Sequence, residues 1–280
     1  MKVRIVPSAT DGSDQQFLTS FILNGVLAVD AGCIGLYGTP REQAEIANVV
    51  LTHSHTDHVC SLPAFAMNLL DLCGRATVVW AHEPVLESLR EDVFNGRTWP
   101  DFLTLMPLGE PIVQLRSIRP RVPFELDGLW LTAIPVNHPV PTMGYIIEDD
   151  TSAIIICTDS GPTEELWERA RSLEKLTTVF AGVSFPDECE ILAEVSGHLT
   201  PKLLHTQIAN LSPGVRVVAV HIKAARRGEV IAQLNALGRP GLSIGTSRVE
   251  YDCSATAGAS DALQRRICTE VAPRSGMVIT

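Results

Sequence analysis

Four side chains of the kinds that bind metal ions lie within one short segment of this chain. His53, His55, Asp57 and His58 directly follow the apolar run Val49–Thr52, which has the length and branched residues of a buried strand. His53 and His55 are two residues apart on a turning backbone and can reach one ion, whereas Asp57 and His58 point toward a second position. Neutral imidazole beside carboxylate suits Zn, Mn or Fe, so the segment predicts a metal site at the end of a strand.

Three further ligand-type residues stand at comparable places in the sequence. His138, Asp159 and His221 each follow an apolar run that resembles a strand. A rigid scaffold that brings strand ends to one edge would bring these side chains together. We therefore expect them to complete the site begun at His53.

The rest of the chain alternates short apolar runs with helical patterns. Predicted helices start near Thr39, Thr163 and Thr200, and the amphipathic stretch Arg226–Leu237 ends at Gly238. Early strands follow one another as in hairpins, and later ones alternate with helices, which favours sheets covered by helices over one doubly wound sheet. The predicted strands are Lys2–Val6, Phe17–Leu23, Val26–Asp30, Val49–Thr52, Ala76–Trp80, Leu129–Pro135, Met143–Ile147, Ala153–Thr158, Thr178–Val183 and Val215–Val220.

The chain of 280 residues shows no Gly/Ser linker and no internal repeat. We expect one domain over residues 1–253 and a tail over 254–280, in which Ala262–Val271 could form a short helix. The seven cysteines are scattered without a C-x-x-C pair and are expected to be free thiols.

Charge and hydropathy exclude several partners. No signal peptide is evident and no apolar run approaches the roughly 20 residues that span a bilayer, so we expect a cytoplasmic protein without a membrane partner. A net charge of -10 argues against nucleic acid as a partner. It leaves room for a small anionic substrate, because bound divalent metals reverse the local sign of a pocket.

The full set of ligand-type residues resembles the motif of the metallo-β-lactamase superfamily, from about Val26 to His221. This resemblance implies an α/β (α+β) fold, the αββα sandwich of two mixed sheets packed face to face with helices outside. It implies two divalent ions, Zn first and Mn or Fe as alternatives. It also implies that Asp30 orients a ligand; the alternative is a plain turn aspartate before Gly32. The implied ligands are His53, His55 and His138 for one ion and Asp57, His58 and His221 for the other, with Asp159 bridging.

Within the superfamily the chain is most similar to class II cyclic-nucleotide phosphodiesterases. The segments that carry this likeness are Asp159-Ser160-Gly161-Pro162-Thr163, Val183-Ser184-Phe185-Pro186, Gly197-His198-Leu199-Thr200-Pro201 and His221-Ile222-Lys223. The third of them also resembles a loop of the tRNA 3′-processing nucleases. Four positions depart from the usual pattern without removing a ligand: Thr56 in place of Leu, Ser61 and Thr158 in place of Gly, and Gly182 in place of a Glu that would orient the histidine.

The resemblance implies hydrolysis of 3′,5′-cyclic nucleotides to 5′-monophosphates by a hydroxide that bridges the two metals. Asp57 and His198 are the candidate catalytic residues; His198 could protonate the leaving oxygen or simply lie in a helix-capping region. Lys223 could hold the phosphate or be a solvated surface lysine, and His82 and His205 have no clustered partners.

Three alternatives remain open. The first is an acyl hydrolase for lactones, thioesters or lactams, and the second is a nuclease for RNA 3′ ends. The third is a non-catalytic relative that keeps its metal for stability or partner binding. The expected partner is a small-molecule phosphodiester, and a homodimer is compatible with the sequence.

Overall fold

The computed structural model describes residues 1–107 and 109–255. The helix expected over Ala262–Val271 and Cys268 lie outside the described residues. So does nearly all of the expected tail 254–280, and its separation from a domain over residues 1–253 therefore stays a prediction. None of the helices in the described part of the chain is long and apolar enough to cross a membrane.

Seven strands form the first sheet, in the order β14-β1-β2-β3-β4-β5-β6. Neighbours from β14 to β3 are antiparallel, and those from β3 to β6 are parallel, so the sheet is mixed. The strands are β1 (Lys2–Ile5), β2 (Phe21–Leu23), β3 (Leu27–Val29), β4 (Asn48–Val50), β5 (Thr77–His82), β6 (Val113–Ile118) and β14 (Glu250–Asp252).

The second sheet is also mixed and has the order β13-β12-β11-β10-β9-β8-β7. Neighbours from β7 to β10 are antiparallel, and those from β10 to β13 are parallel. It follows that β8, β10, β11 and β12 all run in the same direction. The strands are β7 (Phe124–Leu126), β8 (Leu129–Val136), β9 (Thr142–Glu148), β10 (Ala153–Cys157), β11 (Leu176–Gly182), β12 (Arg216–Val220) and β13 (Leu242–Ile244).

The two sheets pack face to face over a shared apolar core. Side chains such as Leu23 from the first sheet and Tyr145 and Phe180 from the second belong to one buried cluster. Two other clusters lie on the outer faces, where helices cover each sheet. Burial on both faces explains the nearly continuous apolar sequence of strands such as β10.

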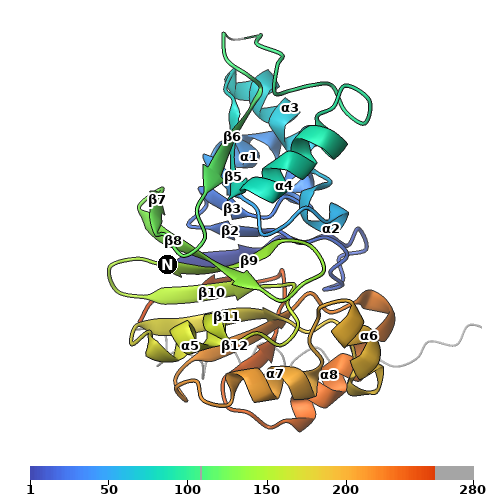
Figure 1. The fold of residues 1–280 in the computed structure, drawn as a ribbon, viewed down its shortest axis with the longest axis vertical. Coiled ribbons are helices and arrows are strands. Elements are labelled where there is room, and N and C mark those ends of the chain that lie inside the picture. Colours follow the sequence, from blue (N-terminus) through green and yellow to red (C-terminus); the bar gives the residue numbers. More distant parts are fainter. Residues whose placement is uncertain (108, 256–280) are drawn as a thin grey trace, which may run out of the picture.

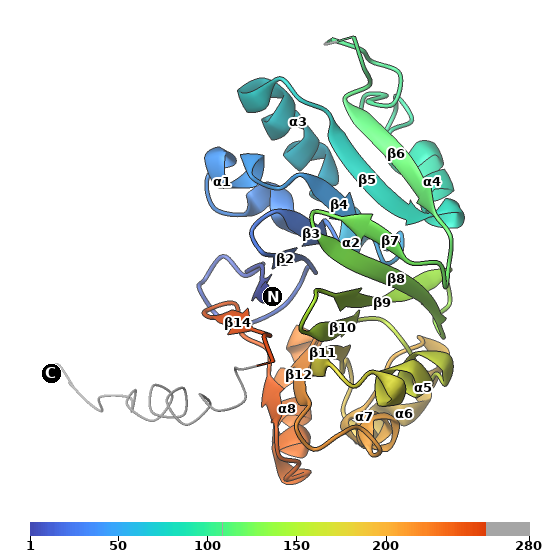
Figure 2. The same cartoon turned by 90° about the vertical axis from the view of Figure 1, so that its left-hand side faces the viewer.

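Helices lie at opposite ends of the molecule, with the sheets between them (Figures 1 and 2). Those of the N-terminal half accompany the first sheet: η1 (Ile34–Leu36), α1 (Pro40–Ala44), α2 (Thr56–Val59), α3 (Leu62–Cys73), α4 (Glu83–Ser88) and η2 (Leu89–Val93). Those of the C-terminal half accompany the second: α5 (Glu165–Ser172), η3 (Asp187–Cys189), α6 (Glu190–Val195), α7 (Pro201–Ile208), η4 (Ala224–Arg226) and α8 (Arg227–Ala236). This arrangement confirms the expected αββα sandwich.

Four helices were predicted from the sequence, and one of these starts is displaced; α2, α3, α4 and α6 were not predicted. Thr39 accepts a hydrogen bond from the backbone of Glu42 in a capping box, and Thr200 caps α7. The expected start at Thr163 is wrong, since α5 begins at Glu165 and its N-cap, Glu164, makes no capping bond. Thr163 instead donates its backbone N–H to a glutamine of α7.

The strand predictions missed four short or polar elements and overextended one. β6 and β7 were not predicted, because they carry charged residues. Both are edge strands, and each pairs with a single neighbour, β5 or β8. β13 and β14 have three residues each, too few for a periodic signal. The predicted strand Phe17–Leu23 begins only at Phe21, and the residues before it belong to a segment in which Gln16 and Thr19 hydrogen-bond to His221.

Candidate metal centre

The strand ends position the predicted ligands. His138, Asp159 and His221 lie just beyond the carboxyl ends of β8, β10 and β12, which point the same way and so meet at one edge of the sheet. In the facing sheet, β4 leads into His53, and His55 is the N-cap of α2.

All seven predicted ligands come together at this edge, and His198 joins them. Their candidate ligand atoms form four overlapping groups, in each of which the atoms lie within 4.8 Å of one another. The groups are His53, His55 and His138; His53, His58 and Asp159; Asp57, His58 and His221; and Asp159, His198 and His221.

The buried carboxylate of Asp159 lies between these groups. Its Oδ2 is 3.1 Å from Nε2 of His58, and its Oδ1 is 3.1 Å from Nε2 of both His221 and His198. Asp57 stands farther out, with Oδ2 3.8 Å from Nε2 of His58 and 3.7 Å from Nε2 of His221. The two oxygens of Asp159 thus face imidazole nitrogens that come from different elements, and the carboxylate belongs to two of the four groups.

Three ligand atoms of the cluster are buried and make no hydrogen bond of good geometry within the described part of the chain. They are Nε2 of His53, and Nε2 of His58 and Oδ2 of Asp159, which lie 3.1 Å from each other. Leaving such atoms unpaired costs free energy, and the cost falls away if a cation binds them. Nitrogen and carboxylate ligands in this number suit a divalent transition metal. The residues present therefore fit the metals expected from the sequence.

The histidines are held mainly in their neutral form, which is the form that binds metal. Burial lowers the pKa of His53, His55, His138 and His221. His58 behaves differently, because the nearby carboxylates outweigh its burial and raise its pKa.

The two carboxylates stay ionised for a related reason. Burial alone would raise the pKa of Asp159, but His221 and His58 outweigh it and hold that pKa well below its usual range. Burial likewise opposes ionisation of Asp57, and His58 and His221 overcome it, so its pKa is lowered.

In three of the histidines, the ring nitrogen that points away from the centre has a hydrogen-bond partner. This contact directs the other ring nitrogen toward the centre. His138 donates from Nδ1 to the carbonyl of Gly197 at 2.9 Å, and His58 donates from Nδ1 to Oδ2 of Asp30 at 2.7 Å. Nδ1 of His221 pairs with Oγ1 of Thr19 at 2.9 Å. Such contacts fix the orientation and tautomer of metal-binding histidines.

Two of these residues have left-handed backbone conformations, which are uncommon outside glycine. Asp30 has φ 61° and His221 has φ 53°. Residues held in this region cost about 1–3 kcal/mol and cluster at functional sites. The fold maintains the strain at both, and Gln16 accepts the backbone N–H of His221 at 2.6 Å.

His198 has a different partner from the one that the family pattern suggests. A Cβ at Gly182 would collide with the backbone oxygen of Thr158, so this backbone leaves no room there for the orienting Glu. Oγ of Ser196 lies 3.1 Å from Nδ1 of His198 and donates its own proton to the carbonyl of Leu192 at 2.6 Å. Ser196 therefore accepts from Nδ1, and Nε2 of His198 faces Asp159.

Lys223 extends to the outer side of the cluster. Its Nζ lies 3.0 Å from Nε2 of His221 and 3.6 Å from Oδ2 of Asp57, and its side chain is partly exposed. The structure thus places Lys223 at the centre rather than on a remote surface. His82 and His205 belong to none of the four groups.

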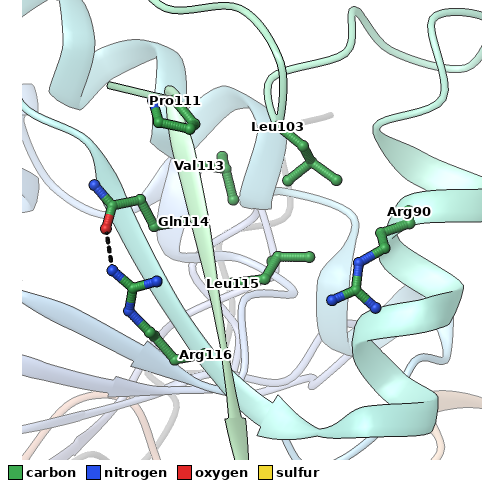
Figure 3. A pocket seen from close by; sticks show the side chains of 7 residues that line it. All are labelled: Arg90, Leu103, Pro111, Val113, Gln114, Leu115 and Arg116. Atoms are coloured by element: carbon green, nitrogen blue, oxygen red, sulfur yellow. Dashed lines mark hydrogen bonds between the residues drawn. The ribbon is translucent and has the colours of Figure 1, made fainter. Parts of the chain in front are cut away.

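A separate surface pocket lies beside β6 (Figure 3) and includes none of these residues. Arg90 and Arg116 line it, but Arg90 pairs with Glu83 at 2.8 Å and Arg116 donates to Gln114 at 2.6 Å. Both guanidinium groups thus already have partners, and no residue of the histidine cluster lines this pocket.

Sequence reasoning missed the residues that support the ligands. Thr19 and Gln16 lie in a loop far from His221 in sequence, and no local pattern marked them. Ser196 and Thr52 adjoin recognised motifs, so their position beside a ligand was an available signal. Six cysteines of the described residues are free, as expected.

Comparison with known proteins places this geometry in context. The family model described as "Beta-lactamase superfamily domain" matches residues 35–222. The chain is 24% identical over 213 residues to 3′,5′-cyclic-nucleotide phosphodiesterase 1 of Saccharomyces cerevisiae, covering 64% of this chain and 57% of that protein. It is 25% identical over 156 residues to ribonuclease Z of Porphyromonas gingivalis, covering 56% and 44% respectively.

The chain thus spans about half the length of these two curated relatives. Among solved structures, unliganded yeast PDE1 superposes with a TM-score of 0.70 at 16% identity, over 87% of this chain and 96% of that one. At this identity the superposition bears on the fold alone.

Proposed function

The chain belongs to the metallo-β-lactamase superfamily of hydrolases, and on that premise we propose that it is a metal-dependent phosphodiesterase acting on 3′,5′-cyclic nucleotides. The observation that carries the proposal is the placement of His198, whose Nε2 lies 3.1 Å from Oδ1 of Asp159. The Gly-His-Leu-Thr-Pro segment, which resembles that of class II phosphodiesterases, thereby brings an imidazole to the edge of the metal cluster, where it can act as an acid or base.

We propose that the centre holds two divalent ions, with Zn as the first candidate and Mn or Fe as alternatives. The proposed ligands are His53, His55 and His138 for one ion and Asp57, His58 and His221 for the other, with Asp159 between them. When bound, such ions polarise a phosphoryl group and lower the pKa of a coordinated water.

The remaining charged groups suit a phosphodiester. Lys223 places an ammonium beside the outer ligands, where it can attract a non-bridging phosphate oxygen. His198, held through Nδ1 by Ser196, can deliver a proton from Nε2 to the leaving oxygen. Asp57 contacts the ammonium of Lys223 and so helps to position it.

Two of the alternatives act on other bonds. A thioester has less need of a proton donor at the position of His198, because its thiolate leaves readily, whereas a lactone or lactam leaves as an alkoxide or amine that also needs a proton. Against those two substrates the proposal rests on the Gly-His-Leu-Thr-Pro segment and its likeness to class II phosphodiesterases. The relationship to ribonuclease Z supports phosphodiester chemistry but suggests RNA as the substrate. The net charge of -10 favours a small nucleotide over a long polyanion.

A substrate panel tests the proposal. Metal-free protein is reconstituted with Zn, Mn or Fe and assayed with cyclic AMP, cyclic GMP and bis-p-nitrophenyl phosphate, beside a chromogenic lactam, a lactone, a thioester and a tRNA precursor. We expect the phosphodiesters to be cleaved far faster, with 5′-monophosphates as products of the cyclic nucleotides. Faster cleavage of an acyl substrate or of the tRNA precursor under the same metal loading would refute the proposal.

A loss-of-function variant for the same panel is Asp159→Ala, which removes the central carboxylate and leaves the neighbouring ligands in place. It should lose both metal and turnover, because two cations would face each other with less negative charge between them. The wild-type protein is assayed both as purified and after chelation and reconstitution with metal. If both preparations bind metal tightly but cleave none of the substrates, the chain is a non-catalytic relative.

A further inference from the structure

The hydroxyl of Thr52 lies between two residues of the metal centre. Its Oγ1 is 3.0 and 2.9 Å from the two carboxylate oxygens of Asp30 and 2.9 Å from Nδ1 of His53. All three side chains are buried. Their hydrogen bonds are therefore shielded from water and can determine how the groups are protonated and oriented.

The direction of these hydrogen bonds follows from the number of available protons. A hydroxyl has one proton to donate, and a carboxylate only accepts, so Thr52 donates to Asp30. Its oxygen then accepts from Nδ1–H of His53. With the ring proton on Nδ1, Nε2 of His53 carries a free lone pair, and this is the buried nitrogen that lacks a partner within the described residues.

The same carboxylate also reaches the other half of the centre. Oδ2 of Asp30 accepts from Nδ1 of His58 at 2.7 Å, which leaves Nε2 of His58 as the ring nitrogen that faces Asp159 and the rest of the cluster. Asp30 thus contacts one proposed ligand of the second ion directly and one proposed ligand of the first ion through Thr52.

We propose that Thr52 is a positioning residue that fixes His53 as its Nδ1–H tautomer, and that Asp30 and Thr52 together orient one ligand of each metal ion. The proposal rests on the metal centre described under the proposed function, but on no particular substrate. It assigns a specific role to the residue that immediately precedes the His-x-His-x-Asp-His motif.

The structure indicates which substitutions separate this role from folding. The backbone N–H of Thr52 donates to Oδ1 of Asp30 at 2.8 Å independently of the side chain. Thr52→Val keeps that bond and the branched shape, and removes only the hydroxyl. Thr52→Ser keeps the hydroxyl. A matched control is Thr77→Val, since the Thr77 hydroxyl is also buried in this sheet and has no hydrogen-bond partner in the described part of the chain.

Metal affinity is the first measurement. Zn is titrated into metal-free protein against a chromogenic chelator, which resolves the two binding steps without any substrate. Loss of an outer partner of a metal-binding histidine weakens metal binding by about 10–100-fold, and we expect this for one of the two ions in Thr52→Val. Thr52→Ser and Thr77→Val should bind both ions as the wild type does.

Nitrogen NMR of the His53 ring is the second measurement and needs no variant. In Zn-loaded wild-type protein we expect a proton on Nδ1 and metal on Nε2. Metal on Nδ1, or a proton on Nε2, would overturn the proposal even if Thr52→Val failed to fold. Wild-type affinity for both ions in Thr52→Val, or equal weakening of both, would also overturn it.

These outcomes are distinguishable from failure of the proposed function. A protein that binds two Zn ions in the expected way but does not cleave cyclic nucleotides would refute the substrate and leave the role of Thr52 intact.

Discussion

Gly197 offers a sharp test of how the fold holds one metal ligand. Its backbone has φ +64°, and a Cβ placed there would lie 2.7 Å from Cδ of Pro139 and 2.9 Å from both Cα and Nδ1 of His138. Ordinary contacts between carbon atoms are about 3.5–4.0 Å. Gly197→Ala therefore forces the two chain segments apart by up to about 1 Å, at the carbonyl that accepts Nδ1–H of His138.

The expected losses can be worked out from these two effects. The left-handed conformation costs a residue with a Cβ roughly 1–2 kcal/mol, and the overlap adds about 1–3 kcal/mol if the surroundings yield only in part. Displacement of His138 should weaken binding of one Zn ion by about 10–100-fold, as when an outer hydrogen bond is lost. Denaturant unfolding of metal-free protein and chelator competition measure the two losses separately.

Gly128→Ala is the matched control. Gly128 has φ +75° in the turn between β7 and β8, but a Cβ there would meet nothing within 4 Å. It should lose about 1–2 kcal/mol of unfolding free energy through backbone strain alone and bind both Zn ions normally. Unchanged metal affinity in Gly197→Ala, or an equal change in the control, would refute the reasoning.

Three further predictions concern individual side chains. His198→Ala should lower turnover of cyclic AMP by about 10²-fold or more at unchanged metal content and hurt p-nitrophenyl esters least; a uniform loss would mean that His198 only positions the phosphate. Burial opposes ionisation of Asp149, but the backbone N–H groups of Thr151 and Ser152 outweigh it and lower its pKa from 3.8. Its contribution to stability should thus be present above about pH 3.8 and be lost as pH falls below that value, and acid unfolding that is unaltered in Asp149→Asn would contradict this. Burial raises the pKa of Cys157 to about 12, so iodoacetamide should label exposed Cys73 in the native protein and spare Cys157, as peptide mass spectrometry would show.

The candidate metal ligands could be predicted from the sequence, whereas the residues that hydrogen-bond to those ligands could not. Ligands such as Asp159 and His221 directly follow buried apolar runs. The carboxyl ends of parallel strands lie at the same edge of a sheet, whatever the sequence of the connecting loops. Residues that hold the ligands from behind need no such signature. Thr19 meets His221 across 202 residues of sequence, and only the packing of the two sheets brings them together.

The fold shows the same division. Buried strands such as β10 consist of apolar residues alone, so their ends are visible in the sequence. Most of them were predicted to within one or two residues. β6 is buried only at its two ends, and its half-buried and exposed middle carries a charged residue, so no strand pattern stood out from the sequence. The family pattern at Gly182 could not reveal that Ser196 would be the partner of His198, because that contact depends on the backbone path after α6.

The central proposal is that the centre holds two metal ions, with the carboxylate of Asp159 between them. Anomalous diffraction from crystals grown with Zn, recorded above and below the Zn absorption edge, tests it most directly. The account predicts two anomalous peaks, one among His53, His55 and His138, and one beside His58 and His221. A single peak, or peaks away from Asp159, would contradict it.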